Sequence, residues 1–203
     1  NEGWDGVRGD RLNYHLEILT SVCRAVEFSH SRGILHRDIK PENVMVGSYG
    51  EVYLLDWGVA IRLDQAKGLS AENLVGSPAF MAPEMTGGGD LSEATDVFLL
   101  GATLHEVLTG SPRHPGDSIF EVLYQASLSA PHEFDEDVPD LIAAICNKAC
   151  APHPEDRFAN VADFRHALGS YIHHQGLTQV CRAAEERLAR ILAMSLDTNE
   201  DSI

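Results

Sequence analysis

The chain has 203 residues, of which 44% are hydrophobic and 23% are charged, a balance typical of a globular domain with one buried core. With a net charge of −16 it lacks the basic surface that nucleic-acid binding needs, so we expect no nucleic-acid partner. No apolar run is long enough to cross a bilayer and no signal-peptide pattern opens the chain, so we expect a cytoplasmic protein with no membrane segment in this chain.

The first predicted element is a helix that starts at Asp10 and ends just before Gly33, after an irregular, glycine-containing entry segment at 1–9. Apolar residues recur in it at intervals of three and four, namely Leu12, Leu16, Leu19, Val22, Cys23 and Val26. Such a helix has one buried face. We therefore expect the helix to pack in the core and to position the polar loop at 36–43 that follows it.

That loop reads His-Arg-Asp-Ile-Lys-Pro-Glu-Asn and holds the candidate catalytic residues Asp38, Lys40 and Asn43. Phosphoryl transfer uses a carboxylate where the attacking hydroxyl arrives, a cation near the transferred group and an oxygen ligand for Mg²⁺. An Asp followed five positions later by an Asn also matches the catalytic-loop signature of protein kinases. Charged residues in a turn are often only solvated, but eight matching positions favour the catalytic interpretation.

Two short strands at 44–46 and 51–55, joined across 47–50, predict a hairpin beside this loop. Asp56-Trp57-Gly58 follows the second strand, and here the chain resembles the C-terminal lobe of a eukaryotic-like, Hanks-type Ser/Thr protein kinase. Trp57 replaces the usual Phe, which suggests a bacterial relative. The resemblance implies Mg²⁺ bound by Asn43 and Asp56, and ATP contacted by these residues, by Lys40 and by Met45 beneath the adenine.

The resemblance also identifies residues 59–75 as an activation segment, in which Ser70 is the one hydroxyl side chain. In such kinases the residue at Arg37 can pair with a phosphate on this segment. We therefore hypothesise that phosphorylation of Ser70 orders the segment through Arg37. The alternative is an ordinary exposed loop serine.

The stretch at 76–84 resembles the family segment that ends in Ala-Pro-Glu. It implies that Ser77 lies near Asp38 and Lys40 and positions the acceptor hydroxyl, in the pattern typical of Ser/Thr specificity. Glu84 ends this stretch, and the resemblance pairs it with Arg157.

Residues 95–108 are apolar nearly all round and predict a central buried helix, capped by Ser92 and ended by Gly110. Asp96 inside it needs partners, because an unpaired buried charge is costly. In kinases the matching Asp accepts hydrogen bonds from the catalytic-loop backbone. With His36, Trp57, Glu84 and Arg157, Asp96 completes the predicted structural support of the site.

Further helices are predicted at 118–128, at 138–150 and from Asn160 to about 172, so the expected fold is mainly α, with one short β-hairpin. Cys146, Cys150 and His153 allow a metal-site interpretation, but without a fourth ligand core packing is favoured. The expected domains are a kinase C-lobe at 1–172, an amphipathic helix at 173–196 after a joint at 173–176, and a disordered acidic tail at 197–203. The last helix is expected to pack on the lobe or, alternatively, to pair with a second copy.

A Gly-rich loop and a strand lysine, which hold ATP from above in the family, are missing from the residues before His36. We therefore expect a C-lobe with the N-lobe absent, inactive by itself, that phosphorylates protein Ser/Thr hydroxyls once an N-lobe completes it. The lobe face left exposed would offer a surface for self-association. Two alternatives are a non-catalytic kinase-like scaffold and a small-molecule phosphotransferase, and Lys40, the Ala-Pro-Glu segment and Arg157 argue against the latter.

Overall fold

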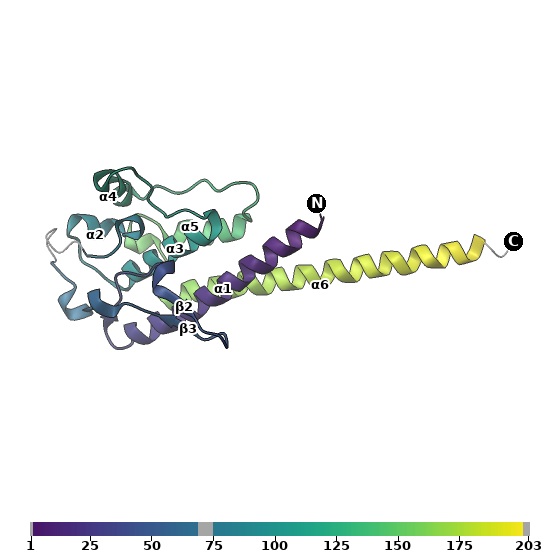
Figure 1. Ribbon diagram of the computed structural model, residues 1–203, viewed down its shortest axis with the longest axis horizontal. Helices are drawn as coiled ribbons and strands as arrows, with labels where there is room; N and C mark the ends of the chain where they lie inside the picture. The colour runs from purple at the N-terminus through teal and green to yellow at the C-terminus, as the bar shows by residue number, and fades with distance from the viewer. Residues whose placement is uncertain (1, 69–74, 201–203) are drawn as a thin grey trace. The chain divides into compact units, whose positions relative to one another are not determined.

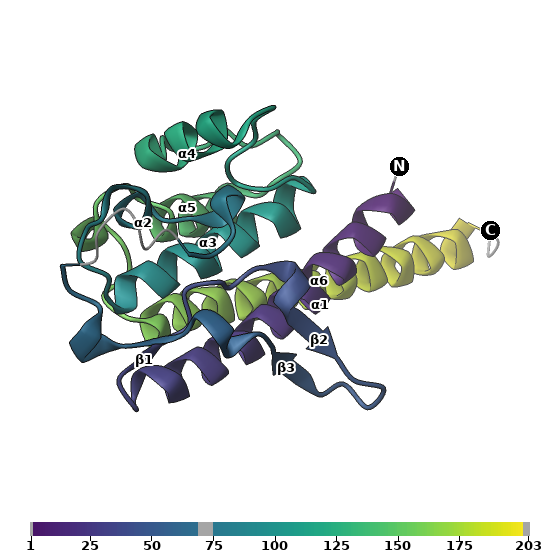
Figure 2. The same ribbon diagram turned by 60° about the vertical axis from the view of Figure 1, so that its left-hand side comes forward.

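The computed structural model describes residues 2–68 and 75–200, and the chain divides into two units, Asn1–Leu168 and Gly169–Ile203. The first unit is mainly helical, as Figures 1 and 2 show. Its helices are α1 (Glu2–His30), α2 (Pro83–Gly87), α3 (Glu93–Thr109), α4 (Ile119–Leu128), α5 (Asp140–Ala149) and the start of α6 (Val161–Glu200). Among the described residues, no helix is long and apolar enough to cross a membrane.

Helix α3 is the centre of the first unit, and α1 and α5 pack against it (Figure 2). Every residue of α3 from Thr95 to His105 is buried, as its all-round apolar sequence predicts. The helix begins with a capping box between Ser92 and Thr95 and ends at Gly110. The predicted central helix and both of its predicted ends are therefore confirmed.

Helix α1 buries the apolar face that its sequence predicts, formed by Leu16, Leu19, Val22, Cys23 and Val26. The helix begins at Glu2, however, so the prediction of an irregular segment at 1–9 is wrong. Each glycine in a helix costs roughly 1 kcal/mol relative to alanine, but extending an existing helix gains one hydrogen bond per residue. The three glycines therefore do not prevent α1 from continuing to its start.

Two small antiparallel sheets flank the 36–43 loop. Strand β2 (Val44–Val46) pairs with β3 (Val52–Leu54), which confirms the predicted hairpin, with Met45 opposite Tyr53. Strand β1 (Ile34–Leu35) pairs with β4 (Ile61–Arg62), a pairing that the sequence did not predict because two-residue strands show no alternation. The second pairing ties the chain just before the loop to the chain just after residues 56–58.

Five described 3-10 turns connect these elements: Pro41–Asn43, Trp57–Val59, Leu63–Gln65, Pro78–Phe80 and Pro154–Asp156. Three of them carry Pro in the first turn, where its missing N–H has no helical partner to lose. Ser118 caps the start of α4, and its hydroxyl accepts from the Glu121 amide.

Helix α6 runs unbroken from Val161 to Glu200. The helix therefore has no break at the predicted joint at 173–176, while the predicted division at 172/173 and the predicted disordered tail at 197–203 stay predictions; residues 201–203 lie outside the described residues. One glycine at 176 costs about 1 kcal/mol in a helix, which is less than nucleating a new helix costs. In the second unit, Leu177, Val180 and Leu188 are exposed, so packing on the lobe and pairing with a second copy both stay predictions.

Candidate active site

The fully buried carboxylate of Asp96 on α3 accepts hydrogen bonds from the backbone of the loop at 36–43. Its Oδ2 accepts from the His36 amide at 2.9 Å and its Oδ1 accepts from the Arg37 amide at 3.0 Å. The ring of His30, at the end of α1, lies 2.7 Å from Oδ2. The hydrogen bonds predicted between Asp96 and the loop backbone are present, and they fix the backbone immediately before Asp38.

The ring of His36 joins this loop to the segment that contains Asp56. Its Nε2 lies 3.1 Å from the Leu55 carbonyl oxygen and therefore donates, while its Nδ1 accepts from the Asp38 amide at 3.3 Å. Burial lowers the pKa of His36, which favours the neutral ring that this pair of bonds requires. Trp57 packs edge-on against the ring at a centroid distance of 4.5 Å.

Asp38, Lys40, Asn43 and Ser77 form one polar cluster. The Lys40 Nζ lies 3.1 Å from Asp38 Oδ2 and donates to Ser77 Oγ at 2.5 Å, and Asn43 Nδ2 donates to Asp38 Oδ2 at 3.1 Å. Burial alone raises the pKa of Asp38, but hydrogen bonds from Ser77 and Lys40, the Lys40 charge and the Asn43 amide lower it below its ordinary value. The carboxylate is therefore ionised, oriented and close to a cation.

Asn43 and Asp56 carry side-chain oxygens of the kind that a divalent cation such as Mg²⁺ prefers as ligands. Among the described residues, both side-chain hydrogen bonds of Asn43 come from its amide nitrogen, to the carbonyl and the carboxylate of Asp38, so its amide oxygen remains available to a cation. Its carbonyl accepts from the Leu55 amide at 2.7 Å, so Asn43 and Asp56 lie on adjacent ends of the β2–β3 pair. Asp56 has a left-handed backbone with φ 60°, and its Oδ1 accepts from the Gly58 amide.

Arg37 also has a positive φ, of 71°, in the middle of the loop. Its guanidinium is mostly buried and its Nε donates to the Val59 carbonyl at 2.6 Å, at the start of the activation segment. Burial lowers its pKa. The predicted partner, Ser70, lies outside the described residues, so its pairing with Arg37 stays a prediction.

An apolar surface lies beside the cluster on the β2–β3 hairpin and the segment after it. Met45, Tyr53, Leu55 and Trp57 are between 39% and 47% exposed there. Trp57 is nevertheless fixed, because its Nε1 donates to the Leu54 carbonyl at 3.0 Å in addition to its contact with His36. Met45 thus has the exposure that a surface beneath a bound base requires.

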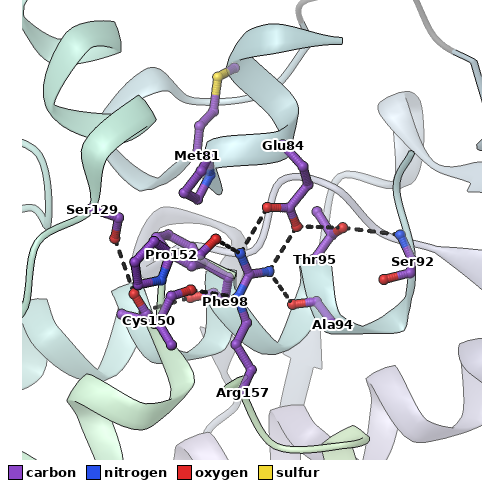
Figure 3. A network of polar contacts seen from close by, with 12 residues as sticks. Met81, Glu84, Ser92, Ala94, Thr95, Phe98, Ser129, Cys150, Pro152 and Arg157 are labelled. Atoms are coloured by element: carbon purple, nitrogen blue, oxygen red, sulfur yellow. Dashed lines mark hydrogen bonds and ion pairs between the residues drawn. The ribbon is translucent and has the colours of Figure 1, made fainter. Parts of the chain in front are cut away.

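Figure 3 shows the buried Glu84–Arg157 pair that supports the segment at 76–84. The guanidinium, whose side chain is 0% exposed, donates to both Glu84 carboxylate oxygens at 2.7 and 2.8 Å. It also donates to the carbonyls of Ala94, Ala151 and Pro152. The predicted pair is present, and it joins α2, α3 and the turn before α6.

Sequence reasoning missed three supporting residues, His30, Thr95 and Gly76. Thr95 donates from its hydroxyl to Glu84 at 2.9 Å, which couples the start of α3 to the buried ion pair (Figure 3). Gly76 has φ 113°, and a Cβ there would lie 2.8 Å from the Arg37 carbonyl oxygen. The Ser-x-x-Thr spacing was a signal for Thr95; no sequence signal linked His30 to Asp96.

Comparison with known proteins gives concordant matches. The family model described as protein kinase domain matches residues 13–168. The serine/threonine-protein kinase PknD of Chlamydia trachomatis serovar D is 34% identical over 182 residues, which cover 77% of this chain and 19% of PknD. PknB of Mycobacterium leprae is 34% identical over 154 residues, which cover 74% of this chain and 25% of PknB. The chain thus spans about a fifth to a quarter of the length of these relatives.

Proposed function

The chain belongs to the protein kinase domain family, and on that premise we propose that it is the C-lobe of an ATP- and Mg²⁺-dependent protein Ser/Thr kinase. The observation that carries the proposal is the cluster in which Asp38 contacts both Lys40 and Asn43 at 3.1 Å. The names of the relatives support the Ser/Thr class. Residues 1–35 contain no Gly-rich loop, and we propose that an N-lobe outside these 203 residues completes the site.

In the proposed mechanism Asp38 accepts a hydrogen bond from the substrate hydroxyl and takes its proton as the oxygen attacks. The lowered pKa of Asp38 keeps it ionised at neutral pH and so able to orient the hydroxyl. Ser77 lies next to both charged groups and positions the acceptor residue. The Lys40 ammonium, anchored 2.5 Å from Ser77 Oγ, is placed to stabilise charge on the transferred group.

When bound, ATP supplies the γ-phosphoryl group and Mg²⁺ offsets the charge on its oxygens. Asn43 and Asp56 would hold the metal through the amide oxygen and the carboxylate, and Met45 would lie beneath the adenine. By itself the 203-residue chain is expected to bind ATP weakly and to show negligible activity, because positioning accounts for most of phosphoryl-transfer catalysis. The same proposal includes regulation in which phosphorylated Ser70 pairs with Arg37.

The test is phosphoryl transfer from labelled ATP to protein Ser and Thr by a longer form of the protein that includes an N-lobe. Transfer is expected to fall at least about a thousandfold in Asp38→Asn, because base and orientation are lost together. Asp140→Asn, at an exposed carboxylate in the first turn of α5, is the matched control and is expected to retain full activity. No transfer by the unmodified longer form, on a panel of proteins, would favour a non-catalytic scaffold instead.

A further inference from the structure

A cavity of about 400 Å³ lies outside the catalytic cluster. Its walls come from the end of α3, the loop after it, the end of α4 and the loop that follows α4. None of the residues that we propose for phosphoryl transfer lines it. The polar side chains in its wall include His105, Thr109, Arg113, Gln125 and His132.

Arg113 is the charged side chain in the wall of this cavity, and no carboxylate among the described residues pairs with it. The residue is only 7% exposed, its Nη2 donates to the Ala130 carbonyl at 2.5 Å, and its Nε has no partner. Its side chain also hydrogen-bonds with the Cys150 thiol and lies near the His105 and His132 rings. Arg157 is buried to the same degree but is paired with Glu84. A buried guanidinium without an anion is costly, so an anion from outside the chain would stabilise Arg113.

Two further groups on separate elements can donate into the same space. The side chains of Gln125 and His132 line the cavity and make no hydrogen bond within the part of the chain that the structure describes. The rings of His105 and His132 pack edge-on with centroids 4.5 Å apart. Three donor side chains from three segments suit a tetrahedral oxyanion with three free oxygens better than a planar carboxylate.

The charges around the cavity also favour the binding of an anion. Burial and the nearby Arg113 charge lower the pKa of His105 to about 4, and burial followed by Arg113 lowers that of His132, against the opposing effect of Asp135 and Glu133. The two imidazoles, which are in edge-on contact in the cavity wall, are therefore neutral at neutral pH. Arg113 sets a positive local field within a chain whose net charge is −16.

We propose that this cavity binds a phosphate monoester, with Arg113 as the principal ligand and Gln125 and His132 as donors to the remaining oxygens. The guanidinium fork binds two oxygens of a phosphate side by side. A cavity of about 400 Å³ also leaves room for the group that carries the phosphate. That group is either a free small molecule or a phosphorylated side chain of a protein, and the site does not depend on phosphoryl transfer at Asp38.

The test is titration of the chain with O-phospho-L-serine, inorganic phosphate, a phosphoserine peptide and, as a blank, L-serine. Binding is followed by calorimetry and by the imidazole NMR signals of His105 and His132. These two signals are expected to shift together and to saturate with the phosphorylated compounds but not with serine. Binding of the peptide at least about tenfold tighter than of inorganic phosphate identifies a phosphorylated side chain as the source, whereas equal affinities identify a free phosphate compound.

Arg113→Gln is expected to weaken binding by about ten- to a hundredfold, the effect of losing hydrogen bonds from a charged donor. Arg62→Gln, at an exposed arginine paired with Asp64, is the matched control and is expected to bind as the unmodified chain does. Gln125→Leu changes an exposed residue and tests the same site without disturbing a buried group. The proposal is overturned if the signals of His105 and His132 do not move in the unmodified chain, or if Arg62→Gln weakens binding as much as Arg113→Gln.

Discussion

Replacing Arg157 by Met removes the charge that balances Glu84 while it keeps most of the side-chain volume. The guanidinium makes five hydrogen bonds, two to the Glu84 carboxylate and three to backbone carbonyls, and its side chain is 0% exposed. Removing one partner of a buried ion pair costs about 3–5 kcal/mol, because the other charge is left without compensation. For a chain of this size that corresponds to a melting temperature lower by about 6–20 °C.

The assay is urea unfolding, with the free energy of unfolding extrapolated to water and the slope compared between variants. Arg62→Met, at an exposed pair with both side chains more than 60% exposed, is the control and should leave the midpoint unchanged. If the stranded Glu84 charge is the cause, the double variant Glu84→Gln/Arg157→Met should be more stable than Arg157→Met alone. A loss below about 1 kcal/mol in Arg157→Met, with an unchanged slope, would refute this reasoning.

Three further perturbations test the support of the site and of the central helix. Asp96→Asn should lower the free energy of unfolding by about 1.5–3 kcal/mol, because the His36 amide loses a charged acceptor. Hydrogen exchange at the His36 amide should become faster for the same reason. An unchanged exchange rate would count against the role of Asp96. The free energy of unfolding should fall as the pH drops from 6.5 towards 4, because His105 and His114 have pKa values lowered to about 4 in the folded chain and bind protons at higher pH in the unfolded chain. In His114→Gln the urea midpoint should depend less steeply on pH over that range. An equally steep dependence would argue against this role of His114. Gly76→Ala should destabilise the chain more than Gly33→Ala in the same urea assay. Both glycines have positive φ, but only a Cβ at 76 meets the Arg37 carbonyl oxygen, at 2.8 Å. Equal losses of unfolding free energy in the two variants would exclude that contact as the cause.

Features written in short, contiguous stretches of sequence could be predicted. The apolar periodicity of α1 and α3, the caps of α3 and the alternation of the β2–β3 hairpin depend on local geometry, and the structure has all of them. The 36–43 loop could be predicted because its chemistry is carried by neighbouring residues. The Glu84–Arg157 pair, 73 residues apart, was available only through the family resemblance.

Features that depend on the choice of a distant partner could not be predicted. His30 contacts Asp96 across 66 residues, and nothing in either local sequence specifies that choice. The β1–β4 pairing and the place of Arg113 in the cavity wall likewise follow from how distant segments pack. Helix α6 continues through Gly176, where a joint is predicted, because extension of a long helix tolerates one glycine.

The central claim is that Asn43 and Asp56 hold the metal beside Asp38. The most direct measurement adds Mn²⁺ with ATP to the isotope-labelled chain and records paramagnetic broadening of its amide NMR signals. The amides of Leu55 and Gly58, next to the proposed ligands, are expected to broaden first, and Asp56→Asn should abolish the effect. Broadening confined to the acidic loop at 133–140, with Leu55 and Gly58 left sharp, would contradict the account.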